Sequence, residues 1–213
     1  ENYWDLGVFV RSHLMFDPVG SSGMPGNNID LGKNFSTPKN IIAIQINAGN
    51  ENRNLFDLQS LRDSNGNLAG KHWTEITLPG MHSDIGGGNE DGYQGKDQQM
   101  AFYAMQLMIN EATKYGIKFN ELPTKYQPTE EFNYLMNFYN QANSGYSANP
   151  TQANQARLKG IEGMVRNSST TNSGWNLLSK EWYKAYNYDI GSQRGRYYPN
   201  DNHLRQPSIN GNH

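Results

Sequence analysis

An aspartate and a histidine, Asp17 and His82, are the side chains of this sequence with the strongest case for acid–base chemistry. Each follows a short apolar segment and precedes a glycine-containing stretch. An imidazole titrates near neutrality and can act as a general base. A carboxylate bonded to its Nδ1 would fix the tautomer, so that Nε2 accepts a proton from a hydroxyl nucleophile. Such a pair would allow a hydroxyl nucleophile to be activated. The alternatives are that His82 closes a loop and that Asp17 starts a turn.

The sequence lacks the motif that usually carries the nucleophile of such a reaction. The elbow Gly-x-Ser-x-Gly occurs nowhere in the sequence, and the Gly-Ser-Ser-Gly run at residues 20–23 is one residue short. That run also follows Asp17, whereas α/β-hydrolases have the order Ser, Asp, His. Ser83 adjoins His82, and neighbouring loop residues rarely face each other. We therefore expect the serine to precede residue 1; otherwise the chain is not a serine hydrolase.

A metal site is the competing chemistry around His82. Asp84, Glu90 and Asp91 could add oxygen ligands to the imidazole. The sequence has no second close histidine and no His-x-x-x-His spacing on a helix. We expect no metal and no cofactor, and we expect Asp84 to accept hydrogen bonds from loop amides.

Three predicted strands would position these residues. They are the apolar run from His13 to Asp17, residues 40–46, and residues 73–78, which Pro79 and Gly80 end. In an open parallel sheet, ligands bind at the carboxyl ends of the strands. Asp17 and His82 are therefore expected at the same edge, with His82 in a loop opened by the glycines at 86–88.

The remaining elements are mostly helical and polar. An apolar stripe predicts a helix over residues 97–115 that stops at Gly116, and a capping pattern predicts a second helix over residues 129–142. The other expected segments are loops at 20–39 and 143–155, a polar excursion at 47–72 with an Asn-Gly turn at 65–66, a weaker helix at 155–165, a linker at 167–174, an aromatic amphipathic segment at 175–188 and a surface tail at 191–213.

Composition excludes several classes of function. The chain has 213 residues, a formal net charge of -2 and no cysteine. This charge gives no electrostatic case for a nucleic-acid partner, and a chain without cysteine has neither disulfides nor thiolate chemistry. No apolar run approaches the roughly 20 residues that span a bilayer, and no signal peptide is apparent. We expect an α/β fold with a mostly parallel sheet and packed helices.

Two segments together resemble one protein family. Residues 14–21, Leu-Met-Phe-Asp-Pro-Val-Gly-Ser, and residues 78–88, Leu-Pro-Gly-Met-His-Ser-Asp-Ile-Gly-Gly-Gly, are similar to the α/β-hydrolase domain of bacterial type VI secretion lipase effectors of the first family. Residues 42–44 with Glu51, Arg53 and Phe56, and the helix before Gly116, extend the likeness over about residues 8–117. The family's Gly-Phe-Ser-Arg-Gly segment is missing, and Asn89 stands where its tyrosine follows the glycines.

The resemblance implies an antibacterial effector, secreted by a bacterial type VI system into the target-cell periplasm, that hydrolyses carboxylic esters of phospholipids with a Ser-His-Asp triad. Asp17 would be its acid and His82 its base. It further implies a phospholipid membrane surface as substrate, with an immunity protein and a secretion-spike protein as partners. Residues 1–120 would be the C-terminal part of the α/β-hydrolase catalytic domain. Residues 121–213 would be a helical lid or accessory region that continues it.

A non-catalytic module is the alternative class. The chain is polar, with a mean hydropathy of -0.83, and it carries 13 tyrosines. Aromatic residues on a polar surface are typical of binding sites. The sequence therefore leaves open a domain that binds a protein or a glycan.

Overall fold

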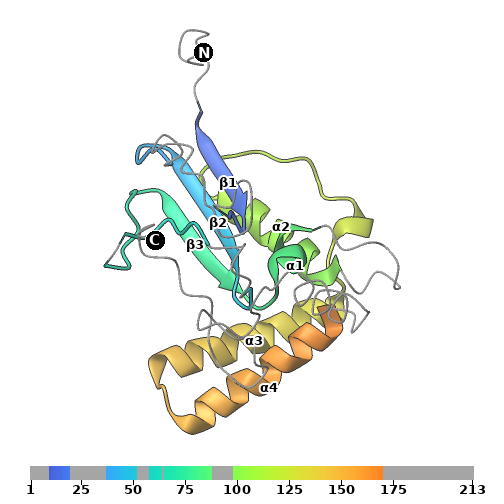
Figure 1. The fold of residues 1–213 in the computed structure, drawn as a ribbon. Coiled ribbons are helices and arrows are strands. Elements are labelled where there is room, and N and C mark those ends of the chain that lie inside the picture. The colour runs from blue at the N-terminus through green and yellow to red at the C-terminus, as the bar shows by residue number, and fades with distance from the viewer. Residues whose placement is uncertain (1–9, 20–36, 52–57, 64, 88–97, 170–213) are drawn as a thin grey trace, which may run out of the picture.

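A three-stranded parallel sheet forms the centre of the computed structural model, which describes residues 10–19, 37–51, 58–63, 65–87 and 98–169. The strands are β1 (Ser12–Phe16), β2 (Ile42–Ala48) and β3 (Trp73–Leu78), in the order β1-β2-β3 (Figure 1). Phe16 pairs with Ile46, and Ile46 pairs with Ile76. The carboxyl ends of the strands therefore meet at one edge, and the predicted α/β fold with a parallel sheet is confirmed.

The middle strand β2 is buried on both faces, with an apolar face and a mixed face on which Gln45 donates to the buried Asn47 side chain at 2.9 Å. Ile44, Ile46 and Ala48 belong to the main core, whereas Ala43 packs in a smaller cluster with Trp73. The strand begins at Ile42, two residues later than predicted, after a turn in which the Ile41 N–H donates to the Pro38 carbonyl at 3.3 Å.

Helices cover one face and the carboxyl end of the sheet. They are α1 (His82–Gly86), α2 (Gln99–Thr113), the 3-10 helix η4 (Thr124–Tyr126), α3 (Glu130–Ala148) and α4 (Gln152–Ser169). The predicted α2 is confirmed, and its stop comes where Gly116 takes a φ of 78°. The predicted cap of α3 is also confirmed, since the Phe132 N–H donates to the Thr129 hydroxyl at 3.2 Å.

The predicted loop at residues 143–155 is wrong. Helix α3 continues to Ala148 and α4 begins at Gln152, so residues 149–151 alone join them. The Asn, Ser and Gly residues there have weak helix propensity, but Ala142 is buried and Tyr146 packs against the core. Helix α4 also extends the weaker predicted helix in both directions and includes the first residues of the predicted linker. The predicted segments beyond residue 169 lie outside the described residues.

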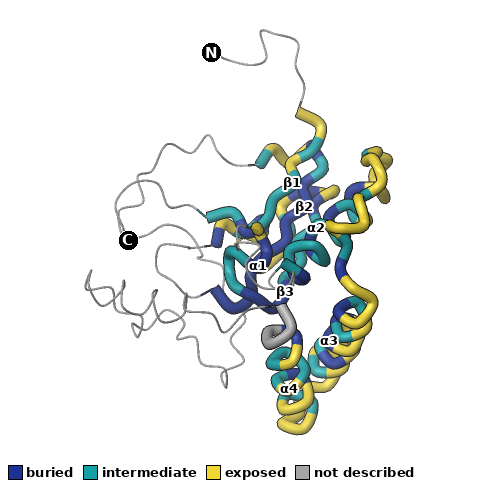
Figure 2. The backbone as a smooth tube through the Cα atoms, turned by 90° about the vertical axis from the view of Figure 1, so that its right-hand side faces the viewer, coloured by how far each residue is buried: buried dark blue, intermediate teal, exposed yellow. Residues whose placement is uncertain are grey.

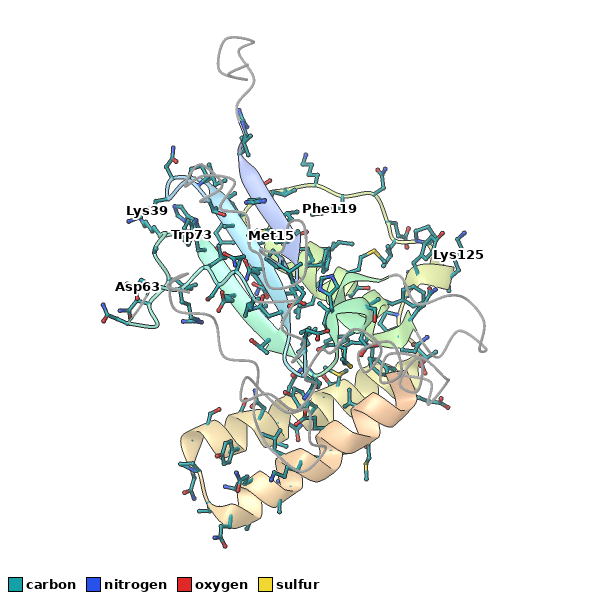
Figure 3. All side chains as sticks on the ribbon, in the orientation of Figure 1. Met15, Lys39, Asp63, Trp73, Phe119 and Lys125 are labelled. Carbon is teal, nitrogen blue, oxygen red and sulfur yellow. The ribbon has the colours of Figure 1, made fainter. Side chains whose placement is uncertain are left out.

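Two apolar layers stabilise the sheet. On one face, α2 packs against the sheet, and the same core continues into the α3–α4 pair beyond the carboxyl ends of the strands, with Met100, Met108, Met136 and Tyr139 among its members. Figure 2 shows the buried segments of the sheet and of these helices in dark blue. On the other face, Trp73 packs with Leu61, and the turn at residues 61–68 projects away from the sheet, with Asp63 at its tip (Figure 3).

The turn at residues 61–68 is the predicted Asn-Gly turn. Gly66 has a φ of 80°, and Asp63 Oδ1 accepts from the N–H groups of Asn65 and Asn67. Among the described helices, none is long and apolar enough to cross a membrane.

Candidate active site

Asp17 and His82 meet at the carboxyl edge of the sheet. His82 Nδ1 lies 2.7 Å from Asp17 Oδ2, which is hydrogen-bonding distance. The Asp17 side chain has no exposed surface, whereas the His82 side chain keeps 30% of its own. The structure thus places a buried carboxylate behind a solvent-accessible imidazole. The expectation that the two residues share one edge is confirmed, and they contact each other directly.

The backbone of Asp17 is fixed by β2. Its N–H donates to the Ile46 carbonyl at 2.7 Å, and its Oδ1 accepts from the Ala48 N–H at 2.9 Å. Asp17 takes a φ of 41°, in the left-handed region that Asp and Asn tolerate better than most residues. One oxygen therefore holds the loop to the sheet while the other faces His82, so Asp17 ends β1 and also orients the imidazole.

His82 lies at the start of a helix and not in an open loop, so the loop predicted there is wrong. Helix α1 begins at His82 because the Ile85 N–H reaches the Met81 carbonyl at 3.2 Å and the buried Asp84 accepts from the Met81 N–H at 2.8 Å. The predicted role of Asp84 as an acceptor from loop amides is confirmed. Ile85, with 1% exposure, anchors the helix in the core.

Three consecutive backbone N–H groups of the turn before α1 each donate to a side chain. The Gly80 N–H donates to Asn50 Oδ1 at 2.7 Å, the Met81 N–H to Asp84, and the His82 N–H to Glu51 Oε2 at 3.2 Å. Gly80 has a φ of 142°, and a Cβ there would lie 3.1 Å from the Asp84 Cβ. The turn therefore requires glycine, and its backbone is held by three side-chain acceptors.

Sequence reasoning missed Asn50 and Glu51 as part of this site. Both are buried, at 6% and 1% exposure, and they follow β2 as Asp17 follows β1 and His82 follows β3. The signal was available, because polar residues directly after a parallel strand lie at the ligand-binding edge. Glu51 entered the sequence argument only through a family resemblance, and its companions Arg53 and Phe56 lie outside the described residues.

The arrangement of Asp17 and His82 is suited to proton transfer. An imidazole whose Nδ1–H donates to Asp17 carries its lone pair on Nε2, which can accept a proton from a hydroxyl group. Among the described residues, no group of three or more His, Asp and Glu side chains could hold a metal ion. Glu90 and Asp91 lie outside the described residues.

Comparisons with known proteins are sparse. No protein-family model matches the chain, and no curated protein matches it significantly. A solved structure that it resembles is that of an uncharacterized protein from Pseudomonas aeruginosa, with 21% sequence identity and a TM-score of 0.47. The match covers 83% of this chain and 31% of the Pseudomonas chain, so this chain spans about a third of that protein's length.

Proposed function

We propose that this chain supplies the acid and the base of a Ser-His-Asp triad in an α/β-hydrolase that cleaves carboxylic esters of phospholipids. The single observation that carries the proposal is the 2.7 Å contact between the buried Asp17 carboxylate and His82 Nδ1. An imidazole held in this way is the base that activates a hydroxyl nucleophile. The sequence resemblance to type VI secretion lipase effectors supports phospholipid as the substrate class and an antibacterial, secreted role.

In this proposal the nucleophile is a serine. Residues 1–213 contain no Gly-x-Ser-x-Gly motif that could supply it. Within the described part of the chain, β1 is paired with a strand on one side only. A further parallel strand on its other side would end beside Asp17, because parallel strands share one carboxyl edge. A serine at the end of that strand would meet His82 from the side opposite β2.

The proposed reaction has two proton transfers at His82 Nε2. The base takes the hydroxyl proton of the serine as its oxygen attacks the ester carbonyl, and the imidazolium then protonates the departing alcohol oxygen. A water molecule that His82 deprotonates hydrolyses the acyl-enzyme, which returns the serine and releases the fatty acid. Throughout the cycle, Asp17 stabilises the charged imidazole and keeps Nδ1 protonated.

The test is lipid hydrolysis by the complete protein that contains these residues. With vesicles of phosphatidylethanolamine and phosphatidylglycerol, we expect release of fatty acid and lysophospholipid. The change His82→Ala should lower kcat by about 10³-fold. His13→Gln is the matched control, because His13 is an exposed histidine that contacts the Thr37 hydroxyl. Residues 1–213 alone should be inactive; turnover by this chain that survives Asp17→Ala would contradict the proposal.

A binding module remains the second candidate because of an observation on α3. Tyr134 and Phe138 are 66% and 38% exposed and form an edge-to-face pair with ring centroids 4.7 Å apart. Together with these two rings, the amides of Asn137, Asn140 and Gln141 line a shallow hollow. Such a surface suits a protein or glycan partner. If the His82→Ala protein hydrolyses lipid as well as the wild type, or neither hydrolyses it, this second function is favoured.

A further inference from the structure

The turn that carries His82 is connected by hydrogen bonds to α4, far along the chain. Glu162 Oε1, on α4, accepts from Asn50 Nδ2 at 2.6 Å. The other end of the same amide, Asn50 Oδ1, accepts from the Gly80 N–H at 2.7 Å. The Asn50 N–H also donates to the Gly80 carbonyl at 2.9 Å. Asn50 therefore holds the peptide of Gly80 on one side and the carboxylate of Glu162 on the other.

The donors and acceptors of these hydrogen bonds allow only one orientation of the Asn50 amide. A carboxylate can only accept and a backbone N–H can only donate, so the amide nitrogen must face Glu162 and the amide oxygen must face Gly80. Asn50 is 6% exposed, which makes a broken bond costly. Glu162 is half-buried, and its charge adds to the effect of burial in raising the pKa of Tyr139 on α3.

The position of α4 makes this connection relevant to the site. The α3–α4 pair lies beyond the carboxyl ends of the strands, next to α1 and α2 (Figure 1). Asn50 is followed by Glu51, whose carboxylate accepts from the His82 N–H. One two-residue segment after β2 thus holds the backbone at both Gly80 and His82, and α4 holds that segment.

We propose that Glu162 and Asn50 are positioning residues for His82, so that the α3–α4 pair is a structural part of the catalytic site. The inference rests on the proposed function for its kinetic consequence, but its structural consequence can be measured without hydrolysis. A base that moves by about 1 Å can lose about 100-fold in rate. Loss of the Asn50–Glu162 bond lets the Asn50 side chain move, which weakens its hold on the Gly80 N–H and lets the imidazole shift relative to Asp17.

A donor–acceptor exchange tests this proposal. Asn50→Asp keeps an oxygen for the Gly80 N–H but turns a second carboxylate oxygen toward Glu162, so the two repel each other. Adding Glu162→Gln restores the bond with reversed polarity, because the new amide nitrogen donates to the aspartate. Glu162→Gln alone keeps an acceptor oxygen for Asn50. We expect kcat for lipid hydrolysis by the complete protein to fall about 10-fold to 100-fold in Asn50→Asp, at nearly constant KM.

The double variant should recover kcat to within about threefold of the wild type, and Glu162→Gln alone should change it by about twofold or less. Matched controls are Asn120→Asp and Glu121→Gln, which make the same chemical changes at exposed positions. A kcat for Asn50→Asp equal to that of these controls overturns the proposal. So does a loss that Glu162→Gln does not repair.

The second readout is the imidazole of His82 itself, observed by NMR in residues 1–213 labelled at histidine. The Nδ1 proton bonded to Asp17 should shift or broaden in Asn50→Asp and return in the double variant. If Asn50→Asp does not fold, Glu162→Leu removes the acceptor from α4 and should give the same shift. An unchanged Nδ1 signal with lowered stability would mean that the pair serves stability alone. A signal that responds while no variant hydrolyses lipid would refute the proposed function and leave the positioning intact.

Discussion

Asp17 meets two requirements that few side chains could meet together. Its backbone has a φ of 41°, and its two carboxylate oxygens contact the Ala48 N–H and His82 Nδ1. An alanine there would lose both contacts and would add the steric cost of a positive φ, which is about 1 kcal/mol or more. The residue therefore contributes to the stability of the β1 end as well as to the orientation of the imidazole.

Asp17→Asn separates these two contributions. Asparagine tolerates a positive φ and still accepts from the Ala48 N–H, so the free energy of unfolding should change by no more than about 1 kcal/mol. The amide nitrogen would donate toward His82 and select the wrong tautomer, so kcat should fall by about 10³-fold to 10⁴-fold. Urea denaturation and fatty-acid release by the complete protein measure the two effects. Activity within tenfold of the wild type would contradict the assigned role of Asp17.

The helices take their bounds from caps and from packing. Thr129 caps α3 with its hydroxyl, while its own N–H donates to Gln99 Oε1 at 2.8 Å, at the start of α2. One residue thus begins α3 and ties it to the helix that covers the sheet. The turn before α1 also depends on a single residue, Gly80, because its φ of 142° is a conformation that residues with a side chain rarely adopt.

Thr129→Ala should lower the free energy of unfolding by about 1 kcal/mol, since the Phe132 N–H loses its side-chain acceptor. Thr129→Ser is the matched control, because serine retains the hydroxyl oxygen and should stay within about 0.5 kcal/mol of the wild type. Both values come from chemical denaturation of residues 1–213. Equal stabilities of the alanine and serine variants would show that the cap contributes nothing.

In the part of the molecule that the structure describes, Tyr139 is a buried ionisable group whose titration reports on folding. Tyr139 on α3 is 2% exposed, and burial, with a smaller effect of the Glu162 charge, raises the pKa of its phenol well above the ordinary value. The unfolded chain releases this proton near pH 10, whereas the folded chain retains it. The contribution of Tyr139 to stability is therefore complete below pH 10 and is lost as the pH rises above that value.

Tyr139→Phe should remove this alkaline loss. Between pH 9 and pH 11 the wild type should lose about 1 kcal/mol more of its free energy of unfolding than the variant does, because each unit above the unfolded pKa costs up to about 1.4 kcal/mol. Urea titrations at closely spaced pH values measure the difference. Tyr126→Phe, at an exposed tyrosine, is the control and should follow the wild type. Parallel pH curves for the wild type and Tyr139→Phe would refute the argument.

Local pattern in the sequence determined the three strands, the helix α2, the cap of α3 and the shared edge of Asp17 and His82. These follow from short-range periodicity and from the rule that parallel strands end together. Packing decided the rest. The Asn- and Ser-rich end of α3 is helical because Ala142 and Tyr146 pack into the core, and propensity alone predicts a loop.

Only the tertiary structure could show how the site is held. The backbone conformation of Asp17, the helix at His82 and the hydrogen bonds of Asn50 to Gly80 and Glu162 depend on segments that are distant in sequence. Spacing along a chain gives the order of such residues but not the distances and angles between their side chains. Those distances and angles are set by the packing of the sheet against α1 and α4.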